Sequence, residues 1–308
     1  MSDTMAEVLA TLGRGYLREA PGLWGKAALA ERLVNPYLRD HPRRRVVRTR
    51  FGARMAVDTQ DLIQRYLYLF GLWEPHLSHW LRRRLRPGDA FIDVGANIGY
   101  FSLLAAHLVG PEGKVVSIEA MPTFHRRLEQ HLALNDLGNV RTVNAAVSDA
   151  QRTLTFILAS SRNMGAASIV PYDGPAEITL DVEAQPLPAL VKPEEIAAAR
   201  VIKIDVEGAE GAVVRGLEPL LARLRPDAEI TVEVTPERMA RLGDSLDELL
   251  DTMARHGFHT YRLPNSYAAG GYPASLPASA ASAAVRWRAP VVEESDLVFS
   301  RVDGERLS

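Results

Sequence analysis

Short runs rich in apolar and β-branched residues alternate with segments of helical periodicity along the centre of the chain. The runs predict strands at 90–94, 114–119, 139–144, 200–205, 229–234 and 258–262. Apolar positions spaced three and four apart predict helices between them, at 101–109, 122–135, 208–224 and 246–256. Strands that alternate with helices are typical of an α/β fold with a mainly parallel sheet and helices on both faces.

The residues before this region follow a different pattern. Leucines at helical spacing over 4–38, interrupted by Pro21-Gly22, predict two short helices, and the alternation over 45–57 predicts a β-hairpin. Helices are expected at 61–69 and 75–85. We therefore predict an N-terminal helical and hairpin extension, residues 1–60, ahead of a main domain, residues 61–308.

Two segments interrupt the alternation of strands and helices. Residues 153–158 and 177–182 alternate in polarity and predict paired strands that flank the segment 161–168. Residues 264–290 are rich in Pro, Ala, Ser and Gly, which predicts a long loop. Loops of this length are usually lids or disordered segments.

Composition limits the class of protein. The chain has 308 residues, of which 47% are hydrophobic, so it can bury one large core or a core with a small appendage. Cysteine is absent, which excludes disulfides, thiolate metal sites and cysteine nucleophiles. No apolar run approaches the roughly 18 residues of a membrane span, and the start lacks the pattern of a secretory signal. We therefore expect a cytoplasmic protein without a membrane span.

The net charge of −2 conceals an uneven distribution. Residues 1–88 hold 16 Lys and Arg against 8 Asp and Glu, with the excess in 43–50 and 82–86. A phosphorylated substrate, a nucleic acid or an anionic surface could use this excess, but arginines that cover the core or face solvent explain it more simply. Nucleic-acid binding is not predicted, because these arginines lack an aromatic stacking platform.

A carboxylate and two glycines mark the end of the first central strand. The segment from Asp89 to Gly99 has the sequence DAFIDVGANIG, in which Gly95 and Gly99 bracket a turn between strand and helix. A dinucleotide site would need G-x-G-x-x-G, and Asp93 would repel a pyrophosphate. A cationic ligand without phosphate, such as S-adenosylmethionine, suits the turn better. Glu119 ends the next strand, where a carboxylate can accept both ribose hydroxyls.

These residues resemble the class I S-adenosylmethionine-dependent methyltransferases. The run from Asp93 to Ser102, DVGANIGYFS, and the run from Ile204 to Glu210, IDVEGAE, are more narrowly similar to the FkbM family. The resemblance implies a Rossmann-like fold whose antiparallel last strand, 296–300, lies at the edge of the sheet. It also implies O-methylation of a hydroxyl on a sugar, a polyketide or another secondary metabolite.

The motif and the resemblance together assign cofactor-binding positions. In the family, the segment after the third strand lines the adenine, largely through its backbone. The expected contacts with S-adenosylmethionine are Asp93, Gly95, Ala96, Asn97, Gly99, Glu119, Ala120, Ala146, Val147 and Asp205. Substrate contacts are expected at Glu74, in a segment that the family carries upstream of the turn, at Asn163, in its Asn-x-Gly loop, and at Glu233.

Four acids, Asp93, Glu119, Asp205 and Glu233, each end a predicted strand, and ligands of open α/β sheets lie at that edge. Methyl transfer requires the protein to align the acceptor oxygen and remove its proton. Asp205 is predicted to do this, with Glu207 close by and Lys203 holding the carboxylate charged. Strand-end carboxylates could instead hold Mg²⁺, but no ligand set is evident, so a metal is not favoured.

Other functions stay open at this stage. A methyltransferase of RNA or of a peptide or protein is one, although the fourth strand lacks the Asn/Asp-Pro-Pro-aromatic loop of RNA-base enzymes. An inactive binding protein on the same scaffold and a nicotinamide oxidoreductase are two others; the intact glycine turn and Asp93 argue against them. We expect a small-molecule hydroxyl acceptor as the partner, and the N-terminal helices could support a homodimer.

Overall fold

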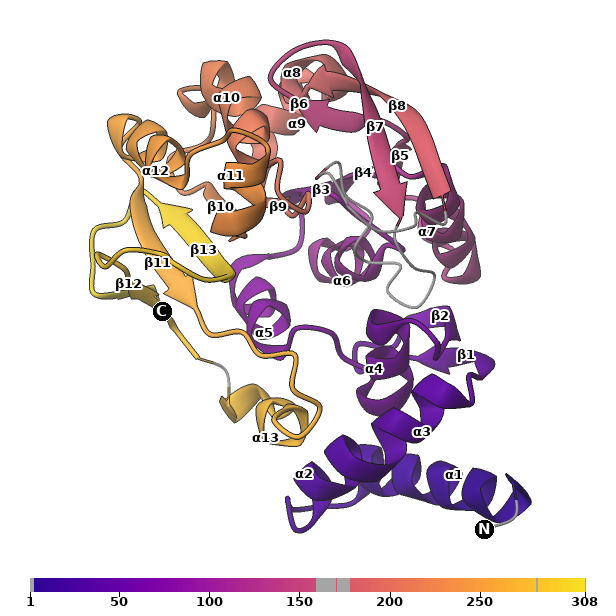
Figure 1. Ribbon diagram of the computed structural model, residues 1–308. Coiled ribbons are helices and arrows are strands. Elements are labelled where there is room, and N and C mark those ends of the chain that lie inside the picture. Colours follow the sequence, from indigo (N-terminus) through magenta and orange to yellow (C-terminus); the bar gives the residue numbers. More distant parts are fainter. Residues whose placement is uncertain (1–2, 159–169, 171–177, 281, 308) are drawn as a thin grey trace. The chain divides into compact units, whose positions relative to one another are not determined.

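The computed structural model describes residues 3–158, 170, 178–280 and 282–307 (Figure 1). The chain forms two compact units. Unit 1 comprises residues 1–79, 160–165 and 265–282, and unit 2 comprises residues 80–159, 166–264 and 283–308. The predicted extension, residues 1–60, lies within unit 1, which continues to His79.

Unit 2 is built on a nine-stranded sheet with the order β14-β12-β11-β13-β10-β9-β3-β4-β5. The strands β5, β4, β3, β9 and β10 are parallel, and β13 is antiparallel to β10 and β11. In sheet order, the strands are β5 (Val140–Val143), β4 (Lys114–Ile118), β3 (Ala90–Val94), β9 (Ala199–Ile204), β10 (Glu229–Val234), β13 (Ser295–Ser300), β11 (His259–Leu263), β12 (Ala284–Arg286) and β14 (Arg306–Leu307). The predicted α/β fold with a mainly parallel sheet is confirmed.

Helices connect the parallel strands and bury their apolar faces against the sheet. The main ones are α6 (Tyr100–Val109), α7 (Pro122–Leu134), α10 (Glu210–Leu221), α11 (Pro236–Arg241) and α12 (Leu246–Arg255), with the short α8 (Leu187–Leu190) and α9 (Pro193–Ala198) before β9. The helix α5 (Pro75–Arg84) precedes β3, the first strand of this sheet, and residues of both units form it. One cluster of buried side chains from β3, β4, β9, β10, α10 and α12 forms the core of unit 2. Strand order reverses between β3 and β9, and ligands of such sheets bind at this switch point.

A second, three-stranded sheet of unit 2 has the order β6-β8-β7. Its strands are β6 (Ala146–Ser148), β7 (Arg152–Leu158) and β8 (Ile178–Pro186). The predicted pairing of 153–158 with 177–182 is confirmed and is antiparallel. β8 continues four residues past the predicted end, because its second half pairs in parallel with β6.

Two expectations about the C-terminal region are wrong. The strand at 296–300 is not at the edge of the sheet, because β11 pairs with its free side and β12 and β14 extend the sheet beyond β11. The segment 264–290 is not one long loop, since it contains α13 (Tyr272–Ser275), the 3₁₀ helix η3 (Ala278–Ala280) and β12. Tertiary packing stabilises such short elements, so local periodicity did not reveal them: Tyr272, for example, is buried against Phe70.

Unit 1 begins with two helical segments separated at Pro21-Gly22, as predicted. They are α1 (Asp3–Glu19) and a continuous helical stretch of α2 (Lys26–Leu29), the π-helix η1 (Ala30–Val34) and α3 (Asn35–Asp40). The predicted hairpin is β1 (Arg44–Arg48) paired with β2 (Arg54–Asp58), and α4 (Leu62–Phe70) follows. Among the described residues, no helix combines the length and the apolar character that are needed to cross a bilayer.

Several N-terminal arginines have structural roles inside unit 1. α4 ends at Gly71, which has φ +70°, and arginines supply donors to the carbonyls of its last turn. Arg14 Nε donates to Tyr68 O at 2.8 Å, and Arg50 Nε donates to Phe70 O at 2.9 Å. Some of the arginines that make the N-terminal region basic therefore bind the carbonyl groups at the C-terminal end of α4.

A buried ion-pair cluster at the start of β10 generates a stability prediction. Glu229 is buried and contacts the guanidinium groups of Arg84 at 2.8 Å and Arg200 at 3.0 Å. Glu229→Gln removes the buried carboxylate that both largely buried arginines contact and leaves Arg200 with the exposed Asp227 at 3.6 Å, so we expect a loss of about 3–5 kcal/mol in the free energy of unfolding. Denaturant titration measures it.

The matched control is Glu305→Gln, which removes the partner of Arg288 in an exposed pair. Solvent screens that pair, so its removal should leave the unfolding midpoint unchanged. Equal effects of the two substitutions would contradict the assignment of stability to the buried cluster.

Candidate functional site

The turn after β3 touches the end of β9 at Gly95. Gly95 has φ +80°, and a Cβ there would overlap the backbone carbonyl oxygen of Asp205. The amide of Asp205 donates to Val94 O at 3.0 Å, which continues the sheet ladder to this point. Only glycine satisfies both the positive φ and the close approach. The predicted glycine turn therefore lies against the residue that we predicted to be catalytic.

Glu119 follows β4 and lies beside the same turn. Its Oε2 accepts the backbone N–H of Asn97 at 2.7 Å, and its Oε1 accepts that of Met121 at 2.8 Å. The side chain is almost wholly buried, and this burial raises the pKa of Glu119 to about 7 despite the two N–H donors. Each oxygen retains a lone pair, so the carboxylate can accept two further hydrogen bonds.

Asp93 lies deeper than its neighbours. Its carboxylate is fully buried, and Oδ2 accepts the hydroxyl of Ser102 at 2.6 Å, which in turn accepts that of Ser117 at 2.8 Å. Oδ1 accepts no hydrogen bond from the described residues and lies 4.0 Å from Lys203 Nζ. Burial raises the pKa of Asp93. In this structure Asp93 is thus a buried neighbour of Lys203, and its predicted contact with the cofactor stays a prediction.

Lys203 connects Asp93 to Asp205. Its Nζ lies 2.9 Å from Asp205 Oδ2, and it also lies 5.1 Å from the ring centroid of Phe101. Lys203 is buried, whereas the Asp205 side chain keeps about a quarter of its surface exposed. The predicted contact between the lysine and Asp205 is present.

The loop after Asp205 has an unusual backbone. Glu207 has φ +57° and forms an ion pair with Arg238 of α11. Glu210, at the start of α10, is buried and accepts the N–H of Gly208 at 2.8 Å; burial raises its pKa to about 7. Non-glycine residues with positive φ are uncommon and concentrate at functional sites. Four occur in the described residues, and the predicted site residues Glu74, Asn97 and Glu207 are three of them.

Asp296 is a residue that the sequence analysis missed as a candidate. Because β13 runs antiparallel, its first residues lie at the edge where β10 ends, and Asp296 pairs in register with Glu233. Carboxylate oxygens of these two residues lie within 4.8 Å of one another. Burial and the charge of Asp205 raise the pKa of Asp296 to about 7. The sequence feature that could have identified Asp296 is an acid at the start of a strand that is predicted to be antiparallel.

The remaining predicted residues are distributed over both units. Ala120 follows Glu119, and its carbonyl accepts Asn144 Nδ2 at 2.9 Å. Ala146 and Val147 are buried in β6, where they pair with β8. Glu74, in unit 1, is buried and accepts the Tyr267 hydroxyl at 3.3 Å. Asn163 lies outside the described residues.

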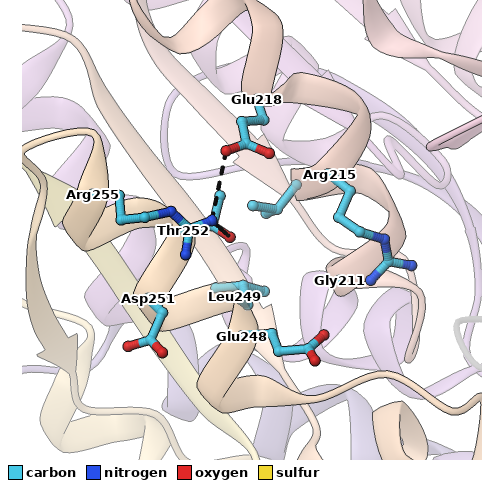
Figure 2. A pocket seen from close by; sticks show the side chains of 9 residues that line it. Gly211, Arg215, Glu218, Glu248, Leu249, Asp251, Thr252 and Arg255 are labelled. Atoms are coloured by element: carbon cyan, nitrogen blue, oxygen red, sulfur yellow. Dashed lines mark hydrogen bonds and ion pairs between the residues drawn. The ribbon is translucent and has the colours of Figure 1, made fainter.

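A hollow between α10 and α12 is separate from these acids (Figure 2). Its lining side chains carry charges that pair with one another, such as Arg255 with Glu218 at 3.6 Å. Arg215 in its wall is bound to Asp244 at 2.6 Å. None of the strand-end acids lines this hollow, so it is not part of the candidate site.

The unit 2 residues fit an S-adenosylmethionine molecule. Gly95 and Gly99 give the turn two residues with positive φ, and Glu119, which accepts the N–H of Asn97 in this turn, keeps lone pairs for a ligand. Carboxylates outnumber cations at this edge, which suits a ligand with a sulfonium and an ammonium group.

Comparison with known proteins agrees with this arrangement. The Methyltransferase FkbM domain model matches residues 93–260, more than half of the chain. AmbE, an AMB antimetabolite synthetase of Pseudomonas aeruginosa, is 30% identical over 209 residues, which cover 56% of this chain and 10% of AmbE. A protein-L-isoaspartate O-methyltransferase of Ignicoccus hospitalis is 29% identical over 136 residues, which cover 43% of this chain and 56% of that protein.

Solved structures are more distant. Aeropyrum pernix fibrillarin with bound S-adenosylmethionine has a TM-score of 0.41 and 10% identity, over 92% of this chain and 85% of that one. The strand order around the switch point, the glycine turn and the family match agree on one conclusion: the chain belongs to the FkbM family of class I S-adenosylmethionine-dependent methyltransferases.

Proposed function

We propose that this protein is an S-adenosylmethionine-dependent O-methyltransferase that methylates a hydroxyl group of a small molecule. The observation that carries the proposal is the Lys203–Asp205 pair at 2.9 Å, directly beside the turn at Gly95. It provides a partly exposed carboxylate, in contact with a buried ammonium group, at the sheet edge where ligands of this fold bind.

Residues of unit 2 hold the donor in this proposal. Glu119 accepts the ribose hydroxyls, and the turn from Gly95 to Gly99 lies along the amino-acid end. Ala120, Ala146 and Val147 border the adenine. Asp93 acts through Lys203 and Ser102, which it contacts from the interior. The donor supplies an activated methyl group on its sulfonium.

Asp205 aligns the acceptor hydroxyl and takes its proton as the oxygen attacks the methyl carbon in line. Lys203 donates to the Asp205 carboxylate at 2.9 Å and orients it. Glu207 is fixed by Arg238 and supports the loop that carries Asp205. Glu74, Asn163 and Glu233 are the proposed acceptor contacts.

A second candidate acceptor is a peptide carboxylate, because several relatives are named protein-L-isoaspartate O-methyltransferases. A screen with a deuterated methyl donor separates the two. It compares sugars, polyketide alcohols and an isoaspartyl peptide, with the mass increase of the acceptor as the readout. Methylation of the peptide alone would reject the small-molecule proposal.

The ribose assignment predicts a large effect of Glu119→Ala. Loss of two hydrogen bonds to a charged acceptor should weaken binding of S-adenosylmethionine by about 2–4 kcal/mol, measured by calorimetry. Glu195→Ala is a control, because that acid is bound to Arg141 at 2.5 Å instead. Unchanged affinity in Glu119→Ala would refute the assignment.

The raised pKa of Glu119 also predicts a pH dependence of donor binding. Ribose hydroxyls donate to the ionised carboxylate, so binding requires the deprotonated form. With a pKa of about 7, the ionised fraction falls roughly tenfold between pH 8 and pH 6, and affinity should fall with it. Burial is the largest cause of this raised pKa, and the charges of Asp93 and Asp205 raise the pKa of Glu119 further.

Glu119→Gln tests this dependence. Its affinity should be lower than that of the wild type at pH 8 and should stay constant from pH 8 to pH 6. An equally steep pH dependence in Glu119→Gln would assign the titration to another group.

The catalytic assignment predicts that Asp205→Asn keeps donor affinity and loses turnover. Removal of a general base typically lowers the rate about 10²–10⁴-fold, whereas Glu119 still holds the donor. Turnover on an acceptor from the screen and calorimetry with the donor measure the two effects. If Asp205 only caps the following loop, asparagine replaces it well and turnover stays near normal.

Wild-type enzyme with and without a chelator completes this experiment. Activity that disappears on chelation and returns with Mg²⁺ would show a metal-assisted reaction in place of the metal-free one proposed. Near-normal turnover of Asp205→Asn would transfer the role of base to Glu233 or Asp296, which lie at the same edge.

A further inference from the structure

Unit 1 has large apolar side chains that are exposed and are not part of its buried core. In the described part of the chain, the exposed leucines and the exposed tryptophan all lie between residues 9 and 33, and valines make up the other exposed large apolar residues. Trp24 is 90% exposed and Leu12 is 64% exposed. The exposed apolar residues of this segment are Val8, Leu9, Leu12, Leu23, Trp24 and Leu33.

Three of these side chains form one stripe on α1. With 3.6 residues per turn, Val8, Leu9 and Leu12 lie within a sector of about 100°. The opposite sector, which contains Ala10 and Leu17, is buried. α1 therefore has a second apolar face in addition to the one that it packs inside unit 1.

The turn between α1 and α2 extends this stripe. Tyr16 lies on the same side of α1 as Leu9 and Leu12, and its hydroxyl donates to the carbonyl of Trp24 at 2.5 Å. This bond places Leu23 and Trp24 at the C-terminal end of the stripe. We call Val8, Leu9, Leu12, Leu23 and Trp24 the apolar ridge.

Exposed arginines flank the ridge on the hairpin side. Arg43, just before β1, donates to the hydroxyl of Thr11 at 2.9 Å, so the hairpin begins beside the N-terminal half of α1. The outward face of β1 carries the exposed Arg44 and Arg48, and Arg44 pairs with Asp58 at 2.8 Å. Arg45 is also exposed, although it shares the strand face of the buried Val47.

We propose that the apolar ridge docks on the surface of an anionic lipid bilayer, with the arginines of the hairpin directed to the head groups. An apolar helix face beside basic residues is typical of interfacial binding, and tryptophan prefers the interface between lipid and water. Charge complementarity favours lipid over a second copy of this chain, because a symmetric dimer through the ridge would bring two arginine-rich hairpins together. The inference is independent of the reaction catalysed in unit 2.

Sedimentation with lipid vesicles tests the proposal on the full-length chain. Vesicles of phosphatidylcholine with about a quarter phosphatidylglycerol are compared with vesicles of phosphatidylcholine alone. Wild type should bind the anionic vesicles more tightly, lose much of this preference as NaCl rises from about 0.1 to about 0.5 M, and show a blue shift of tryptophan emission on binding. Leu12→Gln with Trp24→Ser should lower the partition coefficient at least ~10-fold and remove the shift.

Two further variants separate the contributions. Val292→Ser removes an apolar side chain that is 83% exposed in unit 2, so it should bind like the wild type. Arg45→Ser with Arg48→Ser should lower binding to anionic vesicles several-fold and leave binding to phosphatidylcholine unchanged. All the substituted positions are exposed, so the thermal midpoints should match that of the wild type.

Three results would overturn the proposal. One is equal binding of the wild type and the Leu12→Gln, Trp24→Ser variant to anionic vesicles. Another is the absence of binding by the wild type. The third is a wild-type dimer that does not bind vesicles and that the ridge substitutions dissociate in sedimentation velocity, which would assign the ridge to a second copy.

Discussion

The close approach of Gly95 to the carbonyl oxygen of Asp205 is the constraint on which the candidate site depends. It joins the turn after β3 to the end of β9, the two strands between which the order of the sheet reverses. The amide of Asp205 completes the contact by donating to Val94. Because this contact is between two backbone segments, no rearrangement of side chains could remove the clash that a Cβ at Gly95 would make. The cofactor turn and the proposed base are therefore positioned by one packing contact.

The arginines of the N-terminal region have two different physical roles. Arg14 and Arg50 donate to the last carbonyls of α4, and Arg84 is buried with Glu229 in unit 2. Such arginines replace water at groups that would otherwise be buried without a partner. Arg45 and Arg48 on the hairpin face solvent instead. Net charge by itself did not separate these groups, since the difference depends on which carbonyls and carboxylates the fold brings near.

Local patterns predicted most of the fold and part of the site. The strand runs, the helix periodicities and the glycine turn are local signals, and the strands and helices predicted from them are present. The position of β13 and the short elements of 264–290 depend on pairing with distant strands and on aromatic packing around Tyr272, which periodicity does not encode. The Lys203–Asp205 contact followed from strand parity. Asp296 was missed because its place opposite Glu233 depends on strand order.

The density of carboxyl groups at this edge raises an electrostatic problem for methyl transfer. The sulfonium donor loses its positive charge in the reaction, so fully ionised carboxylates around it would stabilise the starting state more than the transition state. Burial counters this effect: it raises the pKa of Asp93 and brings the pKa values of Glu119 and Asp296 to about 7. Lys203 compensates the partly exposed Asp205 directly. This edge of the sheet therefore carries less negative charge than its number of carboxyl groups suggests, and the buried ammonium group of Lys203 lies directly against Asp205.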